Sequence, residues 1–486
     1  MRLSELLREV EFEGSIKNDF DIKLVTDDSR LVRSGALFVC IRHRSFDGHT
    51  AAAEALASGA AAVVTQERLG LENELNVADS RAAYARLCAA LCGHPERKLR
   101  MIGVTGTNGK TTVTTLIRNI LSDSGIKTLL TGTVCNRLGE ESLPSGLTTP
   151  KPPEFYSLLS RAVLSGCEAC VAEASSQALA QGRLEGIAFD AAVFTNITRD
   201  HLDYHGTFEN YLAAKKKLFE HSEVSTVNLD DPRADEIIAA SSGKTVTFST
   251  VLDCADYTAK NISLLPEGVS FELVSKGRIE HINFASPGLF SVSNAMAAAV
   301  CAINLGVDPR SAAQSLARSK GVCGRLERVE CGTPYSVIID YAHTPDGLEQ
   351  VLRALRPSCR GKLIVLFGCG GDRDKTKRPL MGAAACKYAD TVIVTSDNPR
   401  SEEPMKIIGD ILKGTDKKCR GLFIEEDRRR ATALALSLAK PGDTVLLAGK
   451  GHEKYQLICG EKLPLDERET VREILGLPHD TGRKKP

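Results

Sequence analysis

Residues 101–112 read MIGVTGTNGKTT, and this stretch decides the fold of the chain. Residues 101–105 are a short apolar run typical of a buried strand, and a helical pattern follows over residues 113–121. Backbone N–H groups at the start of such a helix bind phosphate, the Lys110 ammonium neutralises it, and the Thr111 hydroxyl suits Mg²⁺. The stretch therefore predicts a site for a nucleoside triphosphate with magnesium. Its residues are Gly106, Thr107, Asn108, Gly109, Lys110, Thr111 and Thr112.

The loop is a compact variant of the common phosphate loop. That pattern has a glycine five residues before Gly109, where this chain has Val104. A glycine-rich turn without a ligand is the alternative interpretation, and it is common for loose glycine patterns. It does not account for a strand, Gly-Lys-Thr and a helix in this order, so the phosphate site is favoured.

Apolar runs on both sides of this stretch predict an α/β fold with parallel sheets. Residues 169–172 and 191–194 are buried-strand candidates that end at polar residues, as strands beside a site do. Upstream, residues 37–41, 51–58 and 60–65 form a strand, helix, strand unit. Downstream, four strands at 336–340, 362–367, 391–395 and 444–448 predict a second doubly wound sheet. Polar segments at 93–100 and 321–325 divide the chain into three expected domains, 1–97, 98–321 and 322–486.

Composition excludes several classes of protein. The 486 residues contain 62 Lys and Arg against 62 Asp and Glu, so no net positive field favours a nucleic-acid partner. No apolar stretch approaches the roughly 20 residues that span a bilayer. Fifteen cysteines without a secretion signal predict reduced thiols in a cytoplasm, and the CEAC run at 167–170 is interpreted as two core cysteines at the start of a strand. The basic runs at 215–217 and 428–430 are interpreted as solvated helix faces.

The motifs along the chain resemble those of the Mur ligase family of ATP-dependent amide-forming enzymes. GTNGKTT is the family's form of the phosphate loop, and other motifs follow in the family's order across all three expected domains. They are TTP at 148–150, EASS at 173–176, NITRDHLDYHG at 196–206, GRLE at 324–327, DYAHTPD at 340–346, GCGGDRD at 368–374, DNPR at 397–400 and GKGHE at 449–453.

The resemblance implies a central ATP-binding domain between an N-terminal UDP-binding α/β domain and a C-terminal Rossmann-like domain. It implies a cytoplasmic enzyme of peptidoglycan synthesis, which we expect to be a monomer. The implied reaction joins meso-diaminopimelate to UDP-N-acetylmuramoyl-L-alanyl-D-glutamate with ATP and Mg²⁺, through an acyl phosphate. L-lysine as the amino acid, a folylpolyglutamate synthase-like ligase and a phosphate-loop switch ATPase are the alternatives.

The resemblance also assigns binding residues. For ATP these are the phosphate loop with Asn294, Arg325 and Asp340, although Asn294 has helix capping as its alternative role. For the UDP-linked substrate they are Ser29, His43, Thr148, Thr149, Ser175, Gln181 and Arg183. Gln177 departs from the family, which usually has histidine after the paired serines. For diaminopimelate they are Arg373, Asp397, Asn398, Pro399, Arg400, Gly449 and Glu453.

Metal ligands are expected at Thr111, Glu173, His201 and Lys215. Glu173 follows a predicted strand, from which its carboxylate reaches a metal held by Thr111. His201 precedes Lys215 by fourteen residues, the family's spacing to a lysine that is carbamylated. A carbamate replaces an ammonium that would repel Mg²⁺ with an anionic oxygen ligand. Lys110, His201 and Lys215 are thus the expected catalytic residues.

Arg400 is the residue expected to select the amino acid. Its guanidinium is a planar fork that suits a carboxylate, and diaminopimelate differs from lysine by one extra carboxylate. The alternative is that Arg400 pairs with the acidic residues Glu402 and Glu403 that follow it.

Overall fold

The computed structural model describes residues 1–43, 46–265, 267–415, 419 and 421–478. Two compact units make up the chain, residues 1–248 with 297–308, and residues 249–296 with 309–486. The predicted α/β class with parallel sheets is confirmed. The division into two compact units does not test the boundaries expected after residues 97 and 321 between three domains, so these boundaries stay predictions.

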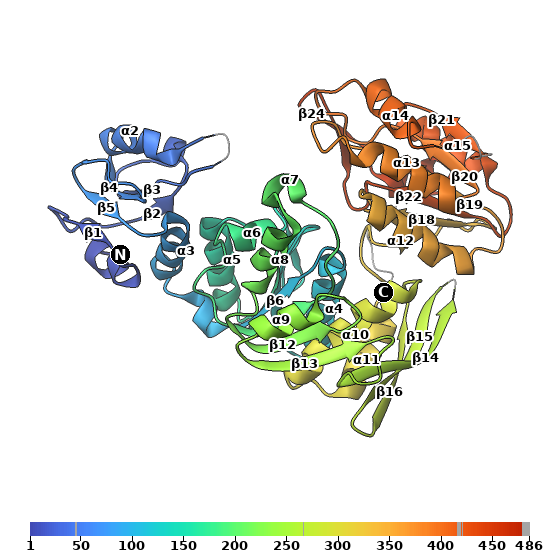
Figure 1. The fold of residues 1–486 in the computed structure, drawn as a ribbon, viewed down its shortest axis with the longest axis horizontal. Helices are drawn as coiled ribbons and strands as arrows, with labels where there is room; N and C mark the ends of the chain where they lie inside the picture. The colour runs from blue at the N-terminus through green and yellow to red at the C-terminus, as the bar shows by residue number, and fades with distance from the viewer. Residues whose placement is uncertain (44–45, 266, 416–418, 420, 479–486) are drawn as a thin grey trace. The chain divides into compact units, whose positions relative to one another are not determined.

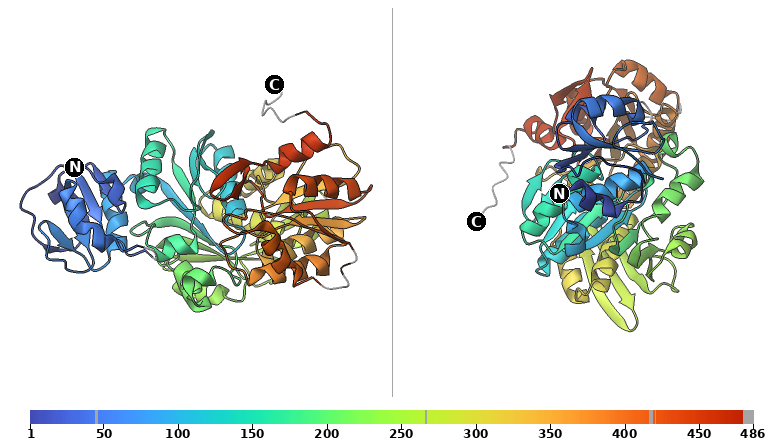
Figure 2. Two further views of the ribbon diagram at one scale, coloured as in Figure 1. Left: turned by 90° about the horizontal axis from the view of Figure 1, so that it is seen from above. Right: turned by 90° about the vertical axis from the view of Figure 1, so that its left-hand side faces the viewer.

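The N-terminal part of the first unit is a five-stranded sheet, blue in Figures 1 and 2. Its order is β1-β5-β4-β3-β2, and only β1 is antiparallel to its neighbour. The strands are β1 (Glu13–Gly14), β2 (Leu24–Thr26), β3 (Ala36–Val39), β4 (Ala60–Thr65) and β5 (Glu74–Asn76). The helices are α1 (Leu3–Leu6), α2 (Ala52–Ala57) and α3 (Ser80–Leu91), with 3-10 turns at Leu7–Glu9, Ser29–Leu31, Gly48–Ala51 and Pro95–Lys98.

The central sheet of the first unit carries the phosphate loop. Its eight strands run in the order β13-β12-β11-β6-β10-β7-β8-β9, parallel except for the β7-β8-β9 meander. The strands are β6 (Arg100–Thr105), β7 (Thr128–Thr131), β8 (Asn136–Leu138), β9 (Glu141–Leu143), β10 (Ala169–Glu173), β11 (Phe189–Phe194), β12 (Ser222–Asn228) and β13 (Lys244–Ser249). The helices are α4 (Lys110–Asp123), α5 (Pro152–Leu164), α6 (Ser176–Ala180), α7 (Leu202–His205), α8 (Phe208–Lys216) and α9 (Ala234–Ala240).

Burial explains why these strands form where the apolar runs predict them. β6 and β10 lie inside the sheet, and every residue of β10 is buried, which suits strands covered on both faces. At Gly103 of β6 a Cβ would lie 2.6 Å from Leu218 and 3.1 Å from the Phe189 ring, so glycine lets both side chains pack on the strand. Cys167 and Cys170 are buried at the start of β10, as predicted.

The second unit contains a six-stranded sheet of order β17-β18-β22-β19-β20-β21, antiparallel only at β17. Its strands are β17 (Glu327–Arg328), β18 (Ser336–Asp340), β19 (Leu363–Phe367), β20 (Thr391–Val394), β21 (Leu422–Ile424) and β22 (Thr444–Ala448). The helices are α11 (Pro309–Arg318), α12 (Pro345–Leu355), α13 (Lys377–Tyr388), α14 (Pro404–Leu412), α15 (Arg428–Leu438) and α16 (Glu467–Ile474), with a 3-10 turn at Arg356–Ser358.

The same unit contains two antiparallel ribbons. One is β14 (Tyr257–Leu265), β15 (Gly268–Ser275) and β16 (Arg278–Phe284), and the other is β23 (Tyr455–Ile458) with β24 (Glu461–Pro464). The long helix α10 (Leu289–Asn304) contributes residues to both units. Within the described ranges, no helix is both long enough and apolar enough to cross a membrane.

Two interpretations of the basic runs are wrong. Arg428 is buried rather than solvated, and its guanidinium pairs with the equally buried Glu467 at 2.7 Å. Lys215 is also buried, whereas Lys217 is exposed, so only part of the run at 215–217 faces solvent. Helix periodicity allows one member of each run to turn inward.

Candidate active site

The phosphate loop lies between the carboxyl end of β6 and the start of α4, as predicted. The segment after β11 braces it: Asn196 accepts hydrogen bonds from the Thr107 N–H through its carbonyl at 2.9 Å and from the Asn108 N–H through Oδ1 at 3.0 Å. At Gly106 a Cβ would lie 1.8 Å from the Thr195 hydroxyl, so this position requires glycine. Lys110 Nζ donates to the Gly106 and Thr107 carbonyls at 2.7 and 2.9 Å, which holds its ammonium over the loop.

Glu173 and Thr111 meet beside this loop. Glu173 is the last residue of β10 rather than the residue past it, and its carboxylate is buried. The Thr111 hydroxyl donates to Glu173 Oε2 at 3.2 Å, and Thr133 donates from its N–H and its hydroxyl at 2.9 Å each. Carboxylate and hydroxyl oxygens are the ligands that Mg²⁺ prefers, so this donor set fits magnesium.

His201 lies in a left-handed backbone conformation, φ +52°, immediately before α7. Its Nε2 is 3.5 Å from Asp200 Oδ2, and its ring meets the edge of the Tyr211 ring with 6.3 Å between centroids. Its side chain is 43% exposed, and partial desolvation lowers the pKa of the imidazole while the neighbouring Asp200 raises it.

Lys215 is a buried lysine near the end of α8. It is 1% exposed, and its Nζ lies 4.6 Å from the centre of the Tyr211 ring. In the described part of the chain, no carboxylate oxygen comes within ion-pair distance of it. Burial, and then the charge of Lys110, lower the pKa of the Lys215 ammonium well below its usual value. An uncharged amine at this position is a nucleophile.

The residues assigned to the UDP-linked substrate in the central sheet come together in one hydrogen-bonded chain. Arg183 donates to the Thr149 carbonyl at 2.7 Å and through two nitrogens to Gln181 Oε1 at 2.9 and 2.7 Å. Ser175 caps α6 and is 3.2 Å from the Thr149 hydroxyl, which donates to it. Gln181 donates to the Tyr204 hydroxyl at 3.0 Å. Thr148 stands apart from this chain and accepts from the Thr133 hydroxyl at 3.0 Å.

In the N-terminal sheet, His43 meets a carboxylate that the sequence reasoning missed. This is Asp27, the first residue after β2 and two residues before the 3-10 turn that begins at Ser29. His43 Nε2 is 3.4 Å from Asp27 Oδ2, and Lys151, which precedes α5, donates to the same carboxylate at 3.0 Å. Asp27 thus connects the N-terminal sheet to the central one within the first unit.

In the second unit, Asp397, Asn398 and Glu453 surround a buried ammonium. Lys450 is 0% exposed and donates to Asn398 Oδ1 at 2.6 Å and to Glu453 Oε2 at 3.2 Å, with Asp397 Oδ1 at 3.4 Å. Asn398 in turn donates through Nδ2 to Glu453 Oε2 at 2.9 Å. Lys450 therefore fixes the direction of the Asn398 amide.

Arg400 holds its guanidinium away from the acidic residues that follow it. Its Nη1 donates to the Gly371 carbonyl at 2.7 Å, and among the described residues no carboxylate lies within ion-pair distance. Glu402 pairs instead with Arg378 and Lys375. The alternative role for Arg400 as the partner of Glu402 is therefore wrong. Pro399 is buried, whereas Arg373 is exposed and donates to the Asp372 carbonyl at 3.1 Å.

Two of the residues assigned to ATP in this unit, Asp340 and Arg325, lie at or beside β18, and the third, Asn294, lies in α10. Asp340 is buried, accepts from the Leu326 and Ala342 N–H groups at 2.7 Å each, and has a pKa raised by burial. The Arg325 guanidinium lies over the Tyr341 ring, 4.8 Å from its centre. Asn294 is a buried residue inside α10, so its alternative role as a helix cap is wrong.

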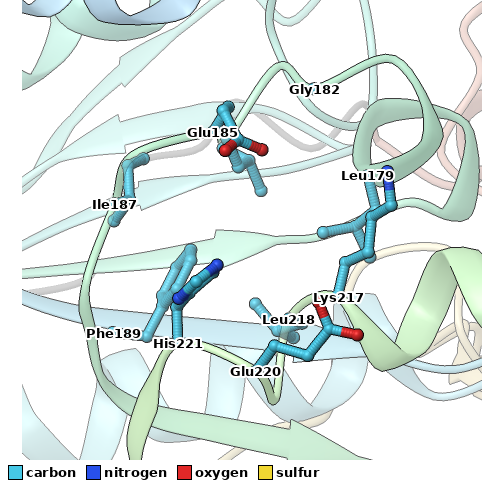
Figure 3. A pocket seen from close by; sticks show the side chains of 10 residues that line it. Leu179, Gly182, Glu185, Ile187, Phe189, Lys217, Leu218, Glu220 and His221 are labelled. Carbon is cyan, nitrogen blue, oxygen red and sulfur yellow. The ribbon is translucent and has the colours of Figure 1, made fainter. Parts of the chain in front are cut away.

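A pocket of about 230 Å³ lies at the opposite end of the central sheet from the phosphate loop (Figure 3). It is lined where β11 and β12 begin, whereas the phosphate loop follows the end of β6, which runs parallel to β11. This pocket is therefore separate from the predicted phosphate site. Its lining residues are Leu179, Gly182, Leu184, Glu185, Ile187, Phe189, Lys217, Leu218, Glu220 and His221.

The side chains missed by sequence reasoning share one property. Each has at least one partner more than twenty residues away along the chain, such as Lys450 with Asn398, 52 residues apart. These side chains are Asp27, Lys151, Tyr204, Arg378 and Lys450. The GKGHE motif contains Lys450, and this was the one local signal for it.

Three family models match this chain, in an order that agrees with the fold and the motifs. They are the Mur ligase family catalytic domain at residues 21–89, the Mur ligase middle domain at 104–302 and the Mur ligase glutamate ligase domain at 324–451. The chain belongs to the Mur ligase family. The expected family, its three-domain α/β fold and its membership of the ligases are confirmed.

Several relatives match this chain over nearly its full length. The chain is 41% identical over 488 residues to the UDP-N-acetylmuramoyl-L-alanyl-D-glutamate–2,6-diaminopimelate ligase of Clostridium tetani, with 98% of this chain and 99% of the relative covered. It is 43% identical to the ligase of the same name from Caldanaerobacter subterraneus, with the same coverage. A solved structure of a ligase of that name superposes with a TM-score of 0.71 at 34% identity, covering 98% of this chain and 99% of that one.

Proposed function

We propose that this chain forms the amide bond between UDP-N-acetylmuramoyl-L-alanyl-D-glutamate and meso-diaminopimelate, using ATP, in the synthesis of peptidoglycan precursors. Relatives 41% and 43% identical over 98% of the chain have this activity in their names. The observation that carries the choice of amino acid is the Arg400 guanidinium, which has no carboxylate partner among the described side chains. A planar cation in that state suits the carboxylate that distinguishes diaminopimelate from lysine.

The chemistry follows from the need to activate a carboxylate in water. A carboxylate oxygen of the D-glutamyl residue takes the γ-phosphoryl group of ATP, and ADP leaves. The amine of diaminopimelate then attacks the acyl carbon of this acyl phosphate, and inorganic phosphate leaves as the amide forms. Both reactants of the first step are anions, so cations held in place contribute most to catalysis. Lys110, held over its loop by two carbonyls, is the cation that we place at the phosphates.

Magnesium would be held by Thr111 and Glu173, whose oxygens are 3.2 Å apart, and it would neutralise phosphate charge. We place His201 and a carbamate on Lys215 at a second magnesium. The burial of Lys215 supports the carbamate, because carbon dioxide adds to an uncharged amine with loss of one proton. The product carries the anionic oxygens that the ammonium lacks.

The remaining assignments are proposed from the same geometry. Arg183 and Gln181, joined to each other and to Thr149, would bind the muramoyl-peptide, and Ser29 and His43 would bind the UDP end. Asn294, Arg325 and Asp340 are placed at the nucleotide. We place the enzyme in the cytoplasm as a monomer. The cytoplasmic location is supported by the fifteen cysteines of the chain, all of which are free thiols.

The test is a substrate-dependent assay of phosphate release with a panel of amino acids. A ligase of this kind releases phosphate only when the UDP-linked dipeptide and diaminopimelate are both present. Release without either substrate indicates a switch ATPase and refutes the proposal. Equal turnover of L-lysine retains the ligase and refutes the choice of amino acid.

A further inference from the structure

A buried guanidinium lies directly behind the loop that holds Arg400. Arg378, on α13, has a side chain that is 0% exposed. Its Nη2 and Nη1 donate to the two oxygens of the Glu402 carboxylate at 2.9 and 3.0 Å, and Nη1 also donates to Asp410 Oδ2 at 3.0 Å. Asp410 lies on α14, so Arg378 has one arm toward that helix and one toward the Arg400 loop.

The Glu402 arm reaches a second loop. Glu402 Oε1 also accepts from the Asp372 N–H at 2.7 Å, and the Asp372 carboxylate accepts from the N–H and the hydroxyl of Ser401 at 3.1 and 2.7 Å. The Gly371 N–H donates to the Asn398 carbonyl at 2.9 Å. Residues 371–372 and 398–402 of segments 368–373 and 397–402 are therefore hydrogen-bonded to each other. Glu402 is their main link to the buried cation, and Arg378 Nη2 also donates to the Gly370 carbonyl at the longer distance of 3.4 Å.

Both segments contain a residue in the left-handed backbone region. Asp372 and Arg400 have φ values of +52° and +54°, which aspartate tolerates better than most side chains and which is unfavourable for arginine. Such residues persist only where their surroundings hold them, and here each segment holds the other. At Gly371 a Cβ would lie 1.9 Å from the Pro399 carbonyl oxygen, which shows how closely the two backbones approach.

We propose that Arg378 is a positioning residue for the amino-acid substrate. Acting through Glu402, it fixes the two loops so that the Arg400 guanidinium is held in place to receive a substrate carboxylate. This inference rests on the proposed function. Arginine suits this position because its planar guanidinium contacts both Glu402 oxygens and Asp410 at once. The single ammonium of a lysine would make these contacts less well.

The two arms of Arg378 separate a positioning role from a structural one. Glu402→Gln keeps the shape of the side chain but weakens the link to the two loops. Asp410→Asn weakens the link to α14, together with an exposed ion pair between Asp410 and Lys413, and leaves the Glu402 contacts of Arg378 in place. It is the matched control because it removes the same charge from the same guanidinium. Arg378→Lys is the conservative variant, which keeps the buried charge and loses the fork.

The experiment measures kcat and the KM values for diaminopimelate, ATP and the UDP-linked dipeptide in the parent and the three variants, with a melting temperature for each. We expect Glu402→Gln to raise the KM for diaminopimelate at least tenfold, with the other two KM values within twofold. Asp410→Asn is expected to lower the melting temperature and leave all three KM values within twofold. Arg378→Lys is expected to raise the KM for diaminopimelate by less than Glu402→Gln does.

Two results would overturn the proposal. One is a folded Glu402→Gln variant whose KM for diaminopimelate stays within twofold of the parent. The other is an Asp410→Asn variant that raises this KM as much as Glu402→Gln does, because the effect is then one of stability. A parent enzyme that prefers lysine refutes the choice of amino acid made above, and the role of Arg378 is then decided by the same comparison of KM values for lysine.

Discussion

Replacing Arg400 with alanine is expected to lower kcat/KM for diaminopimelate about 100-fold and to change kcat/KM for L-lysine little. The Arg400 guanidinium donates to the Gly371 carbonyl, has no carboxylate within ion-pair distance among the described residues, and is only partly buried. Truncating one partner of a hydrogen-bonded charge pair costs about 2–5 kcal/mol, and partial exposure places this pair in the lower half of that range. A loss of about 3 kcal/mol corresponds to about 100-fold.

The preference of the parent enzyme for diaminopimelate over lysine should be larger than the loss of about 100-fold in kcat/KM expected for Arg400→Ala. When lysine is bound, the Arg400 charge has no partner, and sites built to pair a polar group reject the analogue that lacks it by on the order of 10⁴-fold. Arg400→Lys keeps the charge but not the planar fork, so its kcat/KM for diaminopimelate should lie between that of the parent and that of Arg400→Ala.

The assay is steady-state phosphate release with each amino acid, in the parent, Arg400→Ala, Arg400→Lys and the control Lys406→Ala. Lys406 is an exposed residue of α14 that pairs with Glu403, so its removal should change neither rate. The reasoning is refuted if the parent uses lysine as well as diaminopimelate, or if Arg400→Ala loses both activities equally.

Three further predictions concern other parts of the chain. Lys110→Ala should lower kcat by on the order of 10³-fold or more, because the phosphates lose a cation, and should lower the melting temperature only slightly, because the two hydrogen bonds that it removes lie within one half-buried loop. A folded variant with parental kcat contradicts the phosphate-loop assignment. Supplied with ¹³C-bicarbonate, the enzyme should give one carbamate NMR signal that disappears in Lys215→Met and remains in Lys217→Met. An active, magnesium-loaded enzyme that lacks this signal refutes the carbamate. Arg428→Met should lower the free energy of unfolding in urea by about 3–5 kcal/mol, because it leaves the buried Glu467 carboxylate unpaired, whereas replacing the exposed Arg430 with Met should change it by no more than about 0.5 kcal/mol. Similar losses in both variants would contradict the buried pair.

Local patterns in the sequence predict the strands and the phosphate loop well. The apolar runs at 101–105 and 336–340 lie in β6 and β18, and the helix predicted at 113–121 lies within α4. These features depend on neighbours a few residues away, so a window of sequence contains the whole signal.

Buried charges could not be predicted in this way. Arg428 stands in a run of three arginines, and the carboxylate that neutralises it is 39 residues further on. A window that contains the run predicts a solvated face, because burial of a cation is favourable only with a partner that the window omits. Lys215 differs again, since it is buried with no carboxylate within ion-pair distance among the described residues. The role that we propose for it is indicated in the sequence only by the family spacing from His201.

The interlocked segments 368–373 and 397–402 set a limit on protein engineering. A designer who wished to give a lysine-using relative the other specificity would be tempted to transplant the DNPR tetrapeptide alone. In this chain, the backbone of Arg400 is held at φ +54° by the Gly371 loop and by the hairpin residues Leu457 and Cys459, whose backbones hydrogen-bond to it. The smallest transplantable module therefore consists of both loops, the hairpin and the buried arginine behind them.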